Sequence, residues 1–151
     1  MTNESMQWNT GLAIVEEWFR SQDLSEEAHR DDNCCVDQSE VREWTILLNR
    51  RPSSLALIKT ANDVRYQLFM PVMTLSQETD REALFESLLR LNASILMGCA
   101  YGLEGDDIFV IADRSIVHNE VNSLTALMAN VASAADHVCA KKIPKTSTDD
   151  E

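Results

Sequence analysis

Apolar residues recur at helical spacing near the start of the chain, separated by three or four positions. The stripe consists of Trp8, Leu12, Ile14, Val15, Trp18 and Phe19. It predicts an amphipathic helix over 8–19, with Asn9 or Thr10 as its N-cap. The periodicity is lost between Ser21 and Glu40, where acidic and other polar residues predominate, and we expect an exposed loop there.

Alternation of apolar and polar residues then replaces helical spacing in three successive segments. They cover 44–48, 55–60 and 64–70, with turn-forming residues at 50–53 and 62–63. Three adjacent strands of this kind most simply form an antiparallel meander. Pro71 cannot donate a ladder hydrogen bond, so we expect the third strand to end there or to lie at a sheet edge.

A second helical pattern follows the strands. Thr79 and Glu82 have the spacing of a capping box, which predicts a helix start. The apolar face of this helix is wider than packing on one sheet requires, so we expect it also to meet a second copy of the chain. The expected homodimer contact consists of Leu84, Leu88, Leu91 and Ile95.

The last third of the chain predicts a hairpin and a closing helix. The hairpin strands begin near Cys99 and end near Ala112, with an acidic Gly-Asp turn at 104–107, and the helix covers 119–140. The element order is α-β-β-β-α-β-β-α, an α+β sandwich with an antiparallel sheet. We expect one domain over residues 1–140 and a flexible polar tail over 141–151.

The net charge of −12 is concentrated at the start of the chain. Residues 1–40 carry ten acidic residues against two arginines, whereas 41–140 carry twelve acidic and eight basic residues. A surface of this sign repels phosphate groups, so we expect neither nucleic acid nor a membrane as partner, although basic polypeptides are attracted. The chain has no apolar run of the ~20 residues that span a bilayer. It also lacks a signal-peptide pattern, so we expect a cytoplasmic protein.

Candidate chemistry is sparse. Possible metal ligands gather only at His29, Asp31, Asp32, Cys34, Cys35 and Asp37. Adjacent cysteines point apart in a strand, and no second Cys/His pair has a matching spacing, so a solvated acidic loop is favoured over a metal site. Cys99 and Cys139 read as reduced structural thiols, and neither His118 nor His137 completes a Cys-His nucleophile with an orienting group. We therefore expect no catalytic residue, no metal and no cofactor.

One part of the chain resembles a known family. Leu88-Leu89-Arg90-Leu91-Asn92, then Gly98, then the Gly-Leu-Glu-Gly-Asp-Asp hairpin and a final helix are similar to the type III secretion chaperone-like fold. This fold includes the CesT-type secretion chaperones and the YbjN-like proteins. The resemblance implies a non-enzymatic homodimer, and for the secretion chaperones an unfolded, extended client segment held against apolar patches.

The aromatic residues suggest where a client would bind. Trp8 and Trp18 lie on different sides of the first predicted helix, so part of its apolar surface is expected to remain exposed. The predicted client-binding residues are Trp8, Leu12, Trp18, Trp44, Ile46 and Leu48. The alternative is a YbjN-like regulatory or scaffold protein that acts through its dimer and has no client groove. Burial of Trp18, Trp44 and Leu48 in a dimer would favour that alternative.

Overall fold

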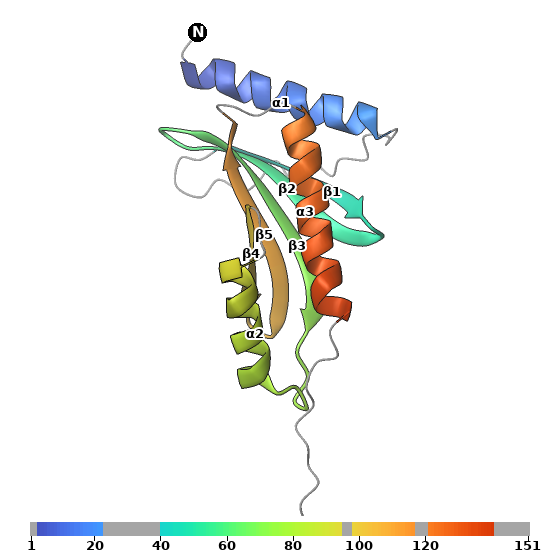
Figure 1. The fold of residues 1–151 in the computed structure, drawn as a ribbon. Helices are drawn as coiled ribbons and strands as arrows, with labels where there is room; N and C mark the ends of the chain where they lie inside the picture. Colours follow the sequence, from blue (N-terminus) through green and yellow to red (C-terminus); the bar gives the residue numbers. More distant parts are fainter. Residues whose placement is uncertain (1–2, 23–39, 95–97, 117–120, 141–151) are drawn as a thin grey trace, which may run out of the picture.

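Three helices and five strands follow one another in the computed structural model, which describes residues 3–22, 40–94, 98–116 and 121–140 (Figure 1). The elements are α1 (Asn3–Ser21), β1 (Glu40–Leu48), β2 (Arg51–Lys59), β3 (Val64–Thr74), α2 (Arg81–Ser94), β4 (Cys99–Glu104), β5 (Asp107–Ser115) and α3 (Val121–Ala140). The predicted order α-β-β-β-α-β-β-α is confirmed. The expected loop over 23–39 and the tail over 141–151 lie outside the described residues.

The strands form one antiparallel sheet in the order β1-β2-β3-β5-β4. The predicted meander is therefore correct, and β1 and β4 are the edge strands. The expectation that the third strand ends at Pro71 or lies at an edge is wrong, because β3 is central and continues to Thr74. Proline is tolerated there because the pairing of β3 with β2 ends at Phe69, and a register shift follows between Pro71 and Met73.

The first hairpin turns two residues earlier than predicted, over 48–51 instead of 50–53. Leu48 pairs with Arg51, and the two residues between them, Asn49 and Arg50, have φ of 48° and 64°. Positive φ at both central residues is the signature of a type I′ turn, whose twist matches that of the strands. Pro52 consequently lies inside β2, opposite Leu47.

Two predicted helix caps are also displaced. The first helix begins at Asn3, so Thr10 lies inside it and its hydroxyl donates to the Met6 carbonyl at 2.8 Å. In the second helix the cap is Asp80, whose Oδ1 accepts from the amide of Ala83 at 3.1 Å. Asp caps a helix as well as Thr does, and it is one residue closer to the first helical turn.

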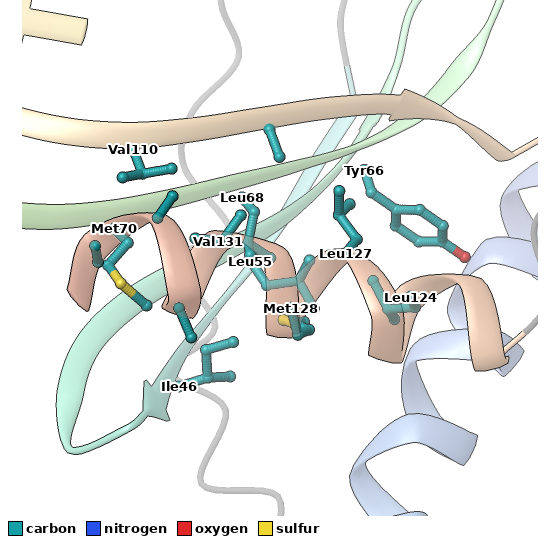
Figure 2. Packing of buried hydrophobic residues seen from close by; sticks show 14 of the residues in the cluster. Ile46, Leu55, Tyr66, Leu68, Met70, Val110, Leu124, Leu127, Met128 and Val131 are labelled. Atoms are coloured by element: carbon teal, nitrogen blue, oxygen red, sulfur yellow. The ribbon is translucent and has the colours of Figure 1, made fainter. Parts of the chain in front are cut away.

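The protein has two layers, because all three helices cover the same face of the sheet (Figure 1). Alternate side chains of each strand point into the core. Those of β3 are Val64, Tyr66, Leu68 and Met70, all fully buried. Figure 2 shows Tyr66, Leu68 and Met70 interleaved with side chains of α3. The labelled α3 residues are Leu124, Leu127, Met128 and Val131. We call this side of the sheet the helix-covered face and the other side the open face.

Candidate polypeptide-binding surfaces

An aromatic cluster joins the end of α1 to β1. The ring centroids of Trp18 and Phe19 are 5.3 Å apart, and those of Phe19 and Trp44 are 6.4 Å apart. The Arg42 guanidinium lies over the Trp44 ring at 5.3 Å. Trp18 and Trp44 are each only 3% exposed, so the cluster holds α1 on the sheet and presents little surface to a partner.

The six predicted client-binding residues therefore divide into two groups. Trp18, Trp44 and Ile46 are buried in the core, whereas Trp8, Leu12 and Leu48 are partly buried and pack against it. The most exposed apolar side chains of α1 and β1 are others, Met6 at 57% and Leu47 at 66%. Leu47 lies in the opposite phase of β1 from Trp44 and Ile46, and so its side chain belongs to the open face.

Two buried donors of this region have no hydrogen-bond partner among the described residues. They are Nε1 of Trp18 and Nε of Arg42. A buried donor left without an acceptor costs about 1–3 kcal/mol.

The outer edge of β1 pairs with no strand of the described chain. In a hairpin with a two-residue turn the closing pair, here Leu48 and Arg51, is hydrogen-bonded, and the two kinds of pair then alternate. Thr45 and Leu47 consequently direct their N–H and C=O groups away from β2. The charges of β1 are confined to residues 40–43, so its second half, 44–48, is an uncharged strand edge.

The opposite edge of the sheet is closed by α2. The amide of Tyr101 in β4 donates to Oδ1 of Asn92 at 2.7 Å, and Nδ2 of Asn92 donates to the Tyr101 carbonyl at 3.2 Å. The side-chain amide thus replaces a neighbouring strand at this position. Within the described part of the chain the two edges therefore differ, since no strand pairs with the outer edge of β1 whereas Asn92 of α2 occupies the edge of β4 at Tyr101.

The expected dimer residues lie beneath α2. Leu84, Leu88 and Leu91 are 6–7% exposed and pack into the core, while Ile95 is outside the described residues. Leu89, on the other side of the helix, is 68% exposed. A partner that meets α2 would therefore contact Leu89 before it reached the three buried leucines.

The open face carries an apolar band that the sequence reasoning missed. One row across the sheet consists of Thr45, Ser54, Phe69, Ile111 and Ala100. Phe109 and Gly102 form part of the next row, and none of Phe69, Phe109 and Ile111 belongs to the helix-covered core. The sequence pattern could have revealed this band, because large apolar residues occupy strand positions that alternate with the buried ones and therefore point to the other face.

Acidic side chains border this band. Glu43 and Asp113 lie on one side, and Glu104 and Asp107 on the other. Arg65 is the basic residue of the same face, and its Nε is 2.6 Å from Oδ1 of Asp113. The border therefore retains a net negative charge.

Other chemistry is limited to a few groups. The described residues contain no group of three or more His, Cys, Asp or Glu side chains that could hold a metal, and the cluster at 29–37 lies outside them. Burial raises the pKa of the Cys99 thiol, which opposes formation of a reactive thiolate although Arg114 acts in the other direction. Cys139 is exposed at the end of α3. None of the helices in the described ranges is long and apolar enough to cross a membrane.

Comparison with known proteins identifies the fold. No family model and no curated protein matches the chain. The chaperone–effector complex HopA1–SchA matches with a TM-score of 0.61 at 13% identity, over 91% of this chain and 97% of the neighbour. The Yersinia pestis type III secretion chaperone SycH, in complex with a fragment of YscM2, matches with a TM-score of 0.58 at 17% identity, over 83% of this chain and 97% of the neighbour.

A third neighbour belongs to the same group. The complex ExoU–SpcU of the Pseudomonas aeruginosa type III secretion system matches with a TM-score of 0.52 at 10% identity, over 82% of this chain and 93% of the neighbour. The predicted resemblance in fold is confirmed: the chain has the fold of the type III secretion chaperones.

Proposed function

We propose that this chain is a non-enzymatic, cytoplasmic, homodimeric protein that holds a polypeptide client in the manner of a secretion chaperone. The fold supports the proposal, as do the neighbours, which were solved as complexes with other polypeptides. The acidic composition favours clients with basic segments. No metal or cofactor takes part in this function.

The uncharged edge of β1 is the observation that carries the proposal. Sheet edges in soluble proteins are normally protected by charge, proline or a covering element, because an unprotected edge pairs with other chains. Residues 44–48 carry no charge, and the neighbouring Leu47 side chain is 66% exposed. An extended client segment that adds to this edge gains main-chain hydrogen bonds, with alternate side chains directed to each face.

The second part of the proposal is a dimer formed through α2. Its support is an apolar helix that keeps Leu89 in water although Leu84, Leu88 and Leu91 already cover the sheet. The three buried leucines hold α2 on the sheet, and Leu89 on its exposed side would contact the second copy.

Thr45 provides the test of client binding. Thr45→Pro removes an N–H that points away from the sheet, whereas Thr45→Val keeps this N–H and changes only an exposed side chain. Extended peptides selected from a random library should bind the wild type and Thr45→Val and should lose binding to Thr45→Pro. Hydrogen exchange at the Thr45 and Leu47 amides should slow when a peptide is bound. Equal binding by both variants, with circular dichroism showing them folded, would refute addition at this edge.

A YbjN-like regulatory or scaffold role is the second candidate. The burial of Trp18 and Trp44 within the chain favours it, because these side chains are unavailable to a client. The regulatory or scaffold role would be favoured if the protein formed a dimer but bound no peptide or protein client.

A further inference from the structure

We propose that the outer edge of β1 pairs with β1 of a second copy of the chain, in antiparallel orientation about a two-fold axis at Trp44. This contact is distinct from the dimer contact through α2, because it joins the two sheets edge to edge. Self-pairing occupies the main-chain groups that an extended client needs, so it regulates access to the client edge. This consequence rests on the proposed function, whereas the pairing itself does not.

The order of charged residues along β1 suits antiparallel self-pairing. The strand has 9 residues, and Trp44 is at its centre. Its charged side chains, Glu40, Arg42 and Glu43, are all in the first half, and the second half is uncharged. Antiparallel pairing about the centre therefore sets each charged residue opposite an uncharged residue of the other copy. Parallel pairing in register would bring like charges together, which destabilises a sheet.

The main-chain groups of the edge match in the same arrangement. Residues 42, 44, 46 and 48 bond β2, so the N–H and C=O groups of the residues between them point outward. With the axis at Trp44, Val41 lies opposite Leu47 of the second copy, and Glu43 lies opposite Thr45. Both residues of each such pair have outward groups, so each pair can exchange both of its hydrogen bonds. Leu47, which is 66% exposed in the single chain, is then covered by Val41 of the second copy.

The end of the hairpin supplies an attractive charge pair. Arg50 is exposed in the turn that follows β1. In the proposed register Glu40 lies opposite Leu48 of the second copy, so Arg50 of that copy lies near the diagonal position. Diagonal neighbours are about 7–8 Å apart, a distance that long side chains span. The two-fold axis makes this attraction twice, once at each end of the paired strands.

The β1–β2 hairpin also differs in charge from the rest of the protein. Residues 40–59 have a net charge of +2, whereas the whole chain has −12. The charged residues of the hairpin are Arg42, Arg50, Arg51 and Lys59 against Glu40 and Glu43. Two copies that meet through this hairpin therefore keep their acidic surfaces apart, which limits the repulsion between them. The contact involves one strand edge from each copy and is small, so we expect weak, transient association.

The test follows self-association of the full chain by sedimentation velocity from micromolar to millimolar concentration. Leu89→Lys is the background for all variants, because it removes the proposed α2 contact and leaves β1 unchanged. We expect this background to dimerise weakly as its concentration rises. Thr45→Pro should weaken association roughly tenfold more than Thr45→Val, since only the proline lacks the outward N–H. Leu47→Lys keeps the main chain and should also weaken association, so it covers loss of folding by the proline variant.

Charge reversal tests the register of the pairing. Glu40→Lys and Arg50→Glu should each weaken association several-fold, since each places like charges at the diagonal contact. The combined variant should regain the association of the background. Loss of the ion pair between Glu40 and Lys59 within the chain, at 3.2 Å, is common to Glu40→Lys and the combined variant and so cannot explain the recovery. Glu16→Lys reverses the same charge at an exposed position of α1 and should not weaken association.

Three results would overturn the inference: a background that stays monomeric at millimolar concentration, association that neither Thr45→Pro nor Leu47→Lys weakens, and no recovery in the combined charge variant. A monomeric background that binds extended peptides would refute self-pairing alone and uphold client addition at the edge. Association that Thr45→Pro abolishes, in a background that binds no peptide, would uphold self-pairing and refute the client function. If both hold, extended peptides should dissociate the paired copies, and the apparent peptide affinity should fall as the protein concentration rises.

Discussion

The side chain of Asn92 in α2 hydrogen-bonds both main-chain groups of Tyr101 in β4, at 2.7 Å and 3.2 Å. The Tyr101 hydroxyl in turn donates to the Ala134 carbonyl of α3 at 2.6 Å. Tyr101 therefore ties the edge strand to two helices. The Leu-Leu-Arg-Leu-Asn sequence, which carries the family resemblance, has a structural role here, because its asparagine closes one edge of the sheet.

Replacement of Asn92 should reveal how much this closure contributes. Asn92→Ala leaves two main-chain groups of β4 without their partner, so the free energy of unfolding should fall by about 1–3 kcal/mol. Urea unfolding measures the loss. Asn122→Ala, at an exposed position of α3, is the matched control and should change stability by less than about 0.5 kcal/mol. Equal stability of the two variants would mean that water replaces Asn92 at no cost.

The element order was predictable because helical and strand periodicities differ strongly along this chain. The exact helix start was not, since Thr79 and Asp80 are adjacent and both are good cap residues. The turn at Asn49 and Arg50 was missed for a similar reason: Arg50 adopts a positive φ that its residue type does not indicate. In these cases local chemistry permits two solutions and tertiary packing selects one.

The candidate surface was harder to predict than the fold. Each strand has two phases, and Phe69 and Phe109 are as apolar as the buried Leu68 and Val110 that alternate with them. Which phase meets the helices depends on the strand order and on the placement of all three helices on one face. These are relations between distant segments, so the sequence predicted Trp18 and Trp44 as surface residues although both are in the core.

Adjacent leucines of α2 should behave oppositely if α2 forms the dimer. Leu88 is 7% exposed and Leu89 is 68% exposed. Leu88→Ala should lower the free energy of unfolding by about 2–5 kcal/mol because it leaves a cavity. Leu89→Lys should retain stability in the monomer and dissociate the dimer in light scattering at micromolar concentration. A wild type that is monomeric at this concentration would reject the dimer, and a dimeric Leu89→Lys would place the interface elsewhere.

The turn between β1 and β2 should be open to stabilisation. Arg50 is exposed at φ 64°, a conformation that costs a non-glycine residue about 1–2 kcal/mol. Arg50→Gly produces the Asn-Gly pair that type I′ turns favour, so the free energy of unfolding should rise by about 1 kcal/mol. Arg50→Ala removes the same charge but keeps the strain, and its stability should stay near that of the wild type. If Arg50→Ala raised the free energy of unfolding as much as Arg50→Gly does, the effect would be due to the lost charge and not to the relieved strain.

Tyr101 should make stability sensitive to alkaline pH. Burial, together with the nearby Cys99 and Cys139, raises the pKa of Tyr101 from 10.0 to about 12. The fold thus favours the neutral phenol, which donates to Ala134. Its contribution is complete below pH 10.0 and is lost as the pH rises through about 12.

Tyr101→Phe tests this linkage by removing the titrating hydroxyl. At neutral pH the variant should be less stable by about 1 kcal/mol, the net value of one hydrogen bond. Its stability should then fall less steeply than that of the wild type in the alkaline range. A decline should remain, because burial also raises the pKa of Tyr66, the only other tyrosine. Urea unfolding at pH 8, 9.5 and 11, with tyrosinate absorbance followed at 295 nm, measures both effects. Parallel pH profiles for the two proteins would show that the Tyr101 proton is not linked to folding.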